Sequence, residues 1–327
     1  MINAIIIDKQ DEEYKVSLSA VNQEQLGEGD VLVKVSYSTL NYKDALAITG
    51  KSPVVRKFPM VPGIDFVGEV LSSETDKFNV GDKVLLNGFG VGEVHKGGLA
   101  QQAKVKSEWL IPLPKNMSEK NAMAIGTAGY TAMLCVMALE KANITPESGP
   151  VLVTGATGGV GSFSVLLLNK LGFDVVASTG DLSNTSYLKE LGANEVIDRT
   201  ELSGKGKPLM KERWSAAIDS VGSTTLANVC ASIKYGGSVA ACGLAQGFDL
   251  PATVMPFILR GVNLLGVDSV MRPISDRIEA WSRLADLIAE QEFAAITQVI
   301  KLEQAIEYSS LLLAGNVTGR LIVDVNQ

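Results

Sequence analysis

The sequence has few of the residues that build metal centres and disulfides. Its 327 residues include one histidine and three cysteines, Cys135, Cys230 and Cys242, which lie far apart in apolar contexts. An odd number of cysteines without a pairing pattern indicates reduced thiols packed in the interior of a cytoplasmic protein. One histidine and three scattered cysteines cannot supply the ligands of a tetrahedral zinc site. We therefore expect no bound metal.

The chain also lacks an excess of positive charge and a long apolar run. Its formal net charge is −7 at pH 7, and a surface of that sign repels phosphate backbones. The longest apolar stretch, from Gly126 to Leu139, is shorter than the roughly 20 residues that span a bilayer. The start, MINAIIIDKQDEE, has no basic region typical of a secretion signal and is typical of a first strand. We expect neither nucleic acid nor membrane as a partner.

The order of apolar runs predicts two domains of the α/β class. Up to about residue 120, alternating runs such as Val31 to Tyr37 are punctuated densely by Gly and Pro, which favours a β-rich domain. After Ser118, continuous apolar runs alternate with helical segments, as in a parallel sheet covered on both faces. The last 60 residues indicate a helix and two strands that return to the first domain. We predict a β-rich domain over 1–123 plus 268–327, and an inserted Rossmann-type, doubly wound domain over 124–267.

A glycine-rich turn is the most specific motif in the chain. The apolar run Val151–Thr154 leads into Gly155-Ala-Thr-Gly158-Gly-Val-Gly161, and an apolar helical segment follows. Glycines allow a tight turn and a close approach to pyrophosphate, and the helix N-terminus offers free N–H groups. Between a buried strand and a helix, this pattern predicts a dinucleotide site.

The end of the next strand favours NADPH over NADH. NAD enzymes place an acidic residue there to hold the ribose 2′-hydroxyl. Here the strand ends in Ser178 and Thr179, which are small and neutral, and Arg199 follows the third strand. Arg199 could bind a 2′-phosphate through a charge-assisted contact. Asp181 argues the other way if it faces the ribose; the alternative is an exposed turn residue.

Several long segments resemble one protein family over nearly the whole chain. The sequence is similar to the medium-chain dehydrogenase/reductase superfamily, and within it to the YhdH/YhfP-like quinone oxidoreductases, which include acryloyl-CoA reductase. The segments that carry the resemblance are STLNYKDALAITGK, FPMVPGIDFVGEV, GVGEVHKGGLA, GTAGYTAMLCVMALE, TGATGGVGS, YGGSVAACGLA and LPATVMPFILRGVNLLGVDSV. The resemblance implies a GroES-like substrate domain with an inserted Rossmann domain, NADP(H) as cofactor, and a homodimer.

The resemblance also implies a set of cofactor contacts. Tyr42 is expected near the nicotinamide, four residues of the glycine turn on the pyrophosphate, and three residues after the second strand around the ribose phosphate. The implied contacts are Tyr42, Thr157, Gly158, Gly159, Val160, Thr179, Gly180, Asp181, Arg199, Leu244, Ile258, Ser269 and Arg320.

The zinc enzymes of this superfamily use Cys, His and acidic ligands, and the corresponding segments here, LNYKD and PGIDF, contain neither Cys nor His. Without a Lewis acid, reduction of a C=C bond conjugated to a carbonyl is easier than alcohol oxidation. Such a reaction needs hydrogen-bond donors at the developing enolate and a proton for the α-carbon. Asn41 and Tyr42 offer such donors, while Lys43 and Asp44 could simply pair with each other.

We therefore predict a zinc-independent, NADPH-dependent reductase, with conversion of acryloyl-CoA to propanoyl-CoA as the reaction that the resemblance implies. A quinone or enone reductase is the alternative enzyme. A non-catalytic NADPH-binding protein with a structural or RNA-contacting role is the alternative from another class. Lys51, Arg56 and Lys57 could hold the phosphates of coenzyme A or be solvated surface charges, and His95 could line a substrate cleft or be structural.

Overall fold

The computed structural model describes residues 1–10 and 13–327. The chain divides into two compact units: unit 1 comprises Met1–Thr127 and Ser269–Gln327, and unit 2 comprises Ala128–Asp268. The sequence placed the first changeover slightly earlier, after residue 123. In the structure the boundary lies after Thr127, next to a break in the apolar helix α2 (Glu119–Lys141). The break is at Gly126, where φ is 50° and ψ is −157°.

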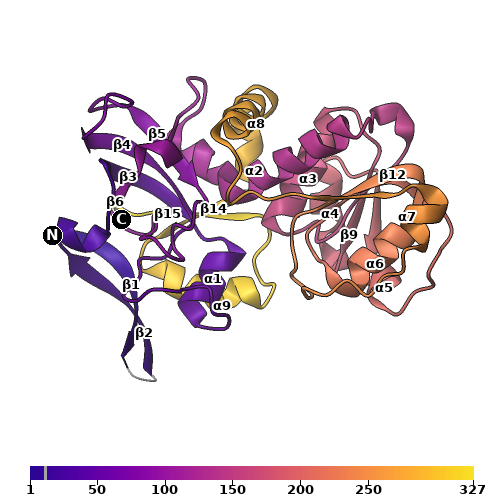
Figure 1. Ribbon diagram of the computed structural model, residues 1–327, viewed down its shortest axis with the longest axis horizontal. Coiled ribbons are helices and arrows are strands. Elements are labelled where there is room, and N and C mark those ends of the chain that lie inside the picture. The colour runs from indigo at the N-terminus through magenta and orange to yellow at the C-terminus, as the bar shows by residue number, and fades with distance from the viewer. Residues whose placement is uncertain (11–12) are drawn as a thin grey trace. The chain divides into compact units, whose positions relative to one another are not determined.

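Unit 1 is built on a seven-stranded sheet with the order β14-β15-β3-β4-β5-β7, in which β6 also pairs with β3. Ile322 pairs with Thr39 across β15 and β3, so the end of the chain returns to the first sheet as the sequence predicted. Helices α1 and α9 pack against each other (Figure 1). The elements are β1 (Ile2–Gln10), β2 (Glu13–Val21), β3 (Val31–Thr39), α1 (Tyr42–Thr49), β4 (Asp65–Ser73), β5 (Lys83–Asn87), β6 (Gln102–Val105), β7 (Ile111–Pro112), α8 (Ile274–Leu287), β14 (Thr297–Lys301), α9 (Gln304–Leu313) and β15 (Arg320–Asp324).

The core of unit 1 follows from the alternation visible in the sequence. Val31, Val33 and Val35 are fully buried on β3, while Lys34 between them is exposed. Side chains of a strand point alternately to its two faces, so this period places every second residue, here each of the three valines, in the core. Strand β3 therefore anchors Asn41, which caps α1, and Tyr42, the first residue of that helix.

Unit 2 contains a six-stranded parallel sheet with the order β10-β9-β8-β11-β12-β13. The chain runs outward from β8 in one direction and then from β11 in the other, so the switch point lies at the carboxyl end of β8. This confirms the doubly wound sheet (Figure 1). The elements are β8 (Val151–Val153), α3 (Gly159–Lys170), β9 (Val175–Thr179), α4 (Thr185–Glu190), β10 (Glu195–Asp198), α5 (Thr200–Ser203), β11 (Trp214–Asp219), α6 (Ser223–Ser232), β12 (Ile233–Ala241), α7 (Met255–Arg260) and β13 (Asn263–Gly266).

Helix α2 is longer than the apolar stretch seen in the sequence. Its 23 residues and its mean hydropathy of 1.7 would suffice, by length and composition alone, to cross a membrane. However, 94% of its most apolar 18-residue window is buried inside the protein, as is usual for the core helix of a globular protein. Short 3-10 turns complete the secondary structure: η1 (Gln23–Leu26), η2 (Ser107–Trp109), η3 (Pro146–Ser148), η4 (Leu182–Asn184) and η5 (Glu290–Ala295).

Candidate functional site

The glycine turn of unit 2 lies at the switch point, directly after β8. Gly155 has φ of 59°, a left-handed conformation that favours glycine. A Cβ atom on Gly161 would lie 2.2 Å from the carbonyl oxygen of Gly155, so only glycine lets the turn close against α3. Gly158 begins α3 without a side-chain cap, which leaves the first N–H groups of the helix available to an anion. The turn therefore fits a diphosphate.

The end of β9 lies next to this turn. The Ala156 N–H donates to the Ser178 carbonyl at 3.0 Å, and Thr179 is 1% exposed. Asp181 caps the 3-10 turn η4, because its carboxylate accepts the Ser183 N–H at 2.9 Å. The hydrogen bonds from Ser183 lower the pKa of Asp181 below its usual value. Asp181 thus has a local capping function, which accounts for an acidic residue here without a contact to the ribose.

Arg199 stands beside the same strand end. Its backbone N–H donates to the Thr179 carbonyl at 2.8 Å. A Cβ atom on Gly180 would come within 2.8 Å of Arg199 Cζ, so the guanidinium lies directly against the glycine backbone. The side chain is exposed and forms no hydrogen bond or ion pair with any residue that the structure describes. A free cation at the end of β9 is well placed for a 2′-phosphate.

The loop after β12 reaches the same edge of the sheet and carries Leu244. The Ser220 hydroxyl donates to the Thr154 carbonyl at 3.1 Å, and the Ala245 N–H donates to the Ser220 carbonyl at 3.4 Å. These bonds connect the loop to the glycine turn. Leu244 is 64% exposed, and Ile258, on α7, is 73% exposed. Leu244 is therefore linked to the turn by these hydrogen bonds, and both apolar side chains are accessible to a ligand.

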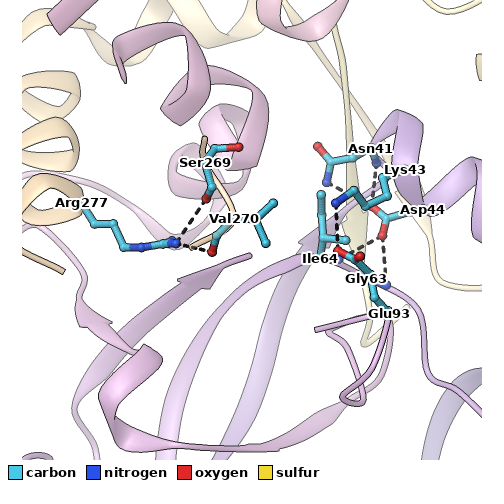
Figure 2. A network of polar contacts seen from close by, with 9 residues as sticks. All are labelled: Asn41, Lys43, Asp44, Gly63, Ile64, Glu93, Ser269, Val270 and Arg277. Atoms are coloured by element: carbon cyan, nitrogen blue, oxygen red, sulfur yellow. Dashed lines mark hydrogen bonds and ion pairs between the residues drawn. The ribbon is translucent and has the colours of Figure 1, made fainter. Parts of the chain in front are cut away.

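In unit 1, Asp44 ties the start of α1 to the loop before β4. One carboxylate oxygen, Oδ2, accepts the Asn41 N–H at 2.9 Å and the Asn41 Nδ2–H at 3.1 Å. The other, Oδ1, accepts the N–H groups of Gly63 at 3.1 Å and Ile64 at 3.0 Å (Figure 2). Asp44 is 1% exposed. Four donors converge on one buried carboxylate, which fixes the first turn of α1.

The side chain of Asn41 is fully engaged in this network. Its Nδ2 also donates to Thr39 Oγ1 at 2.7 Å and to Asp65 Oδ2 at 3.1 Å, and its Oδ1 accepts from Arg320 Nη1 at 3.1 Å. A substrate oxygen could reach this amide only by displacing a carboxylate. These contacts give Asn41 a positioning role, and its donation to an enolate stays a prediction.

Arg320 is buried beside the break in α2. Its Nε donates to the Ala124 carbonyl at 3.3 Å, and its Nη2 is buried without a hydrogen-bond partner among the described residues. A Cβ atom on Gly126 would lie 2.5 Å from this Nη2 and 3.0 Å from Asp65 Oδ2. Glycine at 126 thus leaves space for the guanidinium beside the carboxylate. This Nη2 is therefore a buried donor whose hydrogen-bonding capacity is unused within the described residues.

Two carboxylates and one guanidinium are buried together here. Burial raises the pKa of Asp44 to about 7, and the charge of Asp65 adds to this, while the donors from Asn41 and Ile64 oppose it. Burial also lowers the pKa of Arg320, which Asp65 and Asp44 counteract. Asp44 therefore titrates near neutral pH, unlike an ordinary aspartate.

Tyr42 is the exposed member of the same turn. It is the first residue of α1 and is 47% exposed, and its hydroxyl has no hydrogen-bond partner within the described chain. Its neighbour Lys43 binds Glu93 Oε1 at 2.8 Å (Figure 2). The expected pairing of Lys43 with Asp44 is therefore wrong, because Asp44 is buried among backbone donors. The Tyr42 hydroxyl is free to meet a ligand.

Ser269 belongs to a second network in unit 1. The guanidinium of Arg277, which is 2% exposed, donates from Nη2 to the carbonyls of Ser269 at 3.2 Å and Val270 at 2.7 Å (Figure 2). Its Nη1 donates to the Asn87 carbonyl at 2.6 Å. These bonds fix the backbone at Ser269, the residue expected to contact the cofactor.

The described residues do not fit a zinc site. No group of three or more His, Cys, Asp or Glu side chains is arranged to hold a metal ion in residues 1–10 and 13–327. His95 directs its two ring nitrogens at backbone carbonyls, those of Lys96 at 3.0 Å and Glu28 at 2.5 Å. Its ring also packs edge-on against Trp109. These contacts support a structural role for His95.

Three residues that hold these site elements in place were not identified from the sequence. Thr39 and Glu93 lie 2 and 50 residues from the side chains they bind, and Ser220 lies 66 residues from Thr154. Threonine, glutamate and serine are common surface residues, so only their spatial partners identify them. Asp65 belongs to the same network, because its carboxylate accepts the Thr39 hydroxyl at 2.5 Å and the Thr127 N–H at 2.6 Å.

Comparison with known proteins gives consistent matches over both units. Residues 27–115 match the family model for the alcohol dehydrogenase GroES-like domain, and residues 159–290 match that for zinc-binding dehydrogenases. Acrylyl-CoA reductase AcuI of Ruegeria pomeroyi is 49% identical over 330 residues, covering 100% of both chains. The YhdH oxidoreductase of Salmonella enterica, solved in complex with NADP, is 53% identical, with a TM-score of 0.97 over 99% of both chains. YhfP of Bacillus subtilis, solved with NAD bound, is 44% identical, with a TM-score of 0.94 over 99% of both chains.

Proposed function

The chain belongs to the medium-chain dehydrogenase/reductase family, in its YhdH/YhfP-like branch, and we propose that it reduces acryloyl-CoA to propanoyl-CoA with NADPH. The AcuI relative supports the substrate, and the NADP complex of the Salmonella relative supports the cofactor. The observation that carries the proposal is the unpaired Arg199 guanidinium next to the glycine turn. The Arg199 guanidinium suits the 2′-phosphate of NADPH, and the glycine turn suits its diphosphate.

The residues of unit 2 hold the cofactor. The free N–H groups at the start of α3, those of Gly159 and Val160, bind the diphosphate, with Thr157 and Gly158 beside them in the turn. Arg199 binds the 2′-phosphate over Gly180, and Thr179, small and neutral, leaves it room. When bound, NADPH supplies a hydride to the β-carbon of the alkene.

The residues of unit 1 manage the charge and the proton. As hydride adds to the β-carbon, negative charge develops on the thioester oxygen. The Tyr42 hydroxyl, which has no partner in the described chain, first donates a hydrogen bond to that oxygen and then transfers its proton to the α-carbon, after which solvent water returns a proton to the exposed tyrosinate. Asn41 and Asp44 hold the turn that carries Tyr42. Ser269, Leu244, Ile258 and Arg320 complete the cofactor contacts in this proposal.

The direct test is NADPH consumption with acryloyl-CoA, crotonyl-CoA and 1,4-benzoquinone, before and after dialysis against EDTA. We expect turnover of acryloyl-CoA that EDTA leaves unchanged, because no cluster of side chains in residues 1–10 and 13–327 fits a metal. Turnover of the quinone alone would favour the alternative quinone or enone reductase. Tight NADPH binding without turnover of any acceptor would favour the non-catalytic alternative. Activity lost with EDTA and restored by zinc would contradict the metal-free mechanism.

We further propose a cytoplasmic homodimer that binds neither nucleic acid nor membrane. Strand β13 lies at the edge of the unit 2 sheet and pairs only with β12 within the described chain. Near it in sequence, Phe248 is 92% exposed, Val254 65% and Leu259 56%. An open strand edge with exposed apolar side chains favours pairing with a second copy. Sedimentation at micromolar concentration should give twice the chain mass, and a monomer would contradict the dimer.

A further inference from the structure

The segment between α1 and Pro59 carries three cations whose side chains have no ion-pair partner among the residues that the structure describes. Lys51, Arg56 and Lys57 are exposed, and none of their side chains forms a hydrogen bond or ion pair with the part of the chain that the structure describes. This is unusual in a protein with a net charge of −7. The backbone is nevertheless anchored, because Val55 is 8% exposed within the unit 1 core. We call residues 51–57 the basic loop.

The basic loop is connected to the turn that carries Tyr42. The Arg56 N–H donates to the Glu93 carbonyl at 2.9 Å, and Glu93 Oε1 binds Lys43 Nζ at 2.8 Å. Lys43 directly follows Tyr42 at the start of α1. Glu93 therefore holds one end of the basic loop through its backbone and the beginning of α1 through its side chain. The three cations and the Tyr42 hydroxyl belong to one contiguous structure within unit 1.

We propose that the basic loop binds the phosphates of coenzyme A, with Lys51, Arg56 and Lys57 facing the 3′-phosphate and the diphosphate. The inference rests on the proposed function, because it assumes a coenzyme A thioester as substrate. A phosphomonoester carries about −1.5 to −2 charge at pH 7, and the diphosphate adds to this. Three cations without a partner in the described chain would offset most of that charge, and long exposed side chains suit phosphates at a surface.

The length of the substrate agrees with this placement. The pantetheine arm joins the thioester to the diphosphate through about thirteen bonds, and three backbone bonds advance about 3.5 Å when extended, so the arm spans about 15 Å. Helix α1 has eight residues, which corresponds to about 12 Å at 1.5 Å per residue. Lys51 follows its end by two residues. A thioester at Tyr42 can therefore place its phosphates at the basic loop.

The cofactor does not compete for these cations in the proposal. The phosphates of NADPH are assigned to the glycine turn and Arg199, all of which belong to unit 2. The basic loop is consequently expected to affect only substrates that carry the nucleotide portion of coenzyme A. If the basic loop only stabilised the fold, its substitution would affect all substrates alike.

The test is the double charge reversal R56E/K57E, compared with K115E/K301E, which changes two exposed lysines of the same unit by the same charge. For R56E/K57E we expect the KM for acryloyl-CoA to rise roughly tenfold or more. This KM should also change less with salt concentration than the wild-type KM does. The KM for NADPH and the KM for acryloyl-pantetheine, which lacks the nucleotide, should stay at their wild-type values. Adenosine 3′,5′-bisphosphate should inhibit the wild type competitively with acryloyl-CoA and the variant far less.

The outcomes separate this inference from the proposed function. If the wild type reduces acryloyl-CoA but R56E/K57E and K115E/K301E give the same KM for it, the basic loop does not bind coenzyme A. An equal rise in KM for acryloyl-CoA and acryloyl-pantetheine would likewise overturn the inference. If the wild type reduces neither thioester, the proposed function itself fails, and the inference fails with it.

Discussion

Replacing Arg199 with alanine is expected to raise the KM for NADPH by roughly ten- to a hundredfold and to leave the KM for NADH unchanged. A hydrogen bond to a charged group contributes about 1.5–3 kcal/mol, and each 1.4 kcal/mol corresponds to about a factor of ten. The Arg199 side chain has no partner in the described chain, so its removal should not disturb the fold. Initial rates with each cofactor at saturating acryloyl-CoA give both constants.

A second variant tests the same contact from the glycine beneath it. A Cβ atom on Gly180 would lie 2.8 Å from Arg199 Cζ, so Gly180→Ala should displace the guanidinium and also weaken NADPH selectively. Arg213→Ala is the matched control, because Arg213 is an arginine of the same unit already paired with Glu201 at 2.9 Å. An equal loss for NADPH and NADH in Arg199→Ala would remove the phosphate assignment.

Changing Asp44 to asparagine is expected to lower kcat for acryloyl-CoA by roughly ten- to a hundredfold with little change in the KM for NADPH. The carboxylate accepts four N–H groups, two on each oxygen. The NH2 of an asparagine in its place is itself a donor, so it would leave two of these N–H groups without an acceptor. A buried donor left without a partner costs about 1–3 kcal/mol, which α1 can relieve by moving its first turn. Tyr42 would then move away from the substrate oxygen.

Two further variants show whether this loss acts through Tyr42. Tyr42→Phe removes only the hydroxyl and should lower kcat similarly, without affecting stability, because that hydroxyl has no partner in the described chain. Asp82→Asn is the control: Asp82 also accepts a backbone N–H in unit 1, that of Asn79 at 2.8 Å. Full activity in Tyr42→Phe would exclude it as the proton donor.

The pH dependence follows from the same carboxylate. Asp44 has its pKa raised from 3.8 to about 7 by burial and by Asp65, so the folded state binds its proton more tightly than the unfolded state. The free energy of unfolding should therefore fall as the pH rises from about 4 to 7, by at most roughly 4 kcal/mol, and then level off. Urea unfolding at several pH values should show this slope in the wild type and not in Asp44→Asn.

Catalysis should change in the opposite direction over the same range. Only the ionised carboxylate can accept all four N–H groups, so kcat is expected to rise as the pH increases through about 7. Asp65 and Arg320 are the other charged groups that face this site. A wild-type kcat that does not change between pH 6 and 8 would contradict the link between Asp44 and Tyr42.

Much of unit 2 could be predicted from short stretches of sequence. The buried parallel strands appear as continuous apolar runs, and the glycine turn is visible because backbone geometry there tolerates no Cβ at Gly161. Asp181 was ambiguous, since whether a carboxylate faces a ribose or caps a turn depends on side-chain direction. Asn41 was ambiguous too, because its residue type suits both an enolate donor and a structural hydrogen bond.

Short stretches of the sequence indicated the two-unit α/β architecture and the glycine turn, because hydrophobic periodicity and the need for glycine extend over only a few neighbouring residues. The hydrogen-bond partners of Asp44, Asn41 and Arg320 became evident from the tertiary structure alone. The hydrogen bond between Asn41 and Arg320 joins residues 279 positions apart in the sequence. Lys43 forms its ion pair with Glu93 and not with its neighbour Asp44. Which polar groups are buried together depends on how distant strands pair, and no local pattern records it.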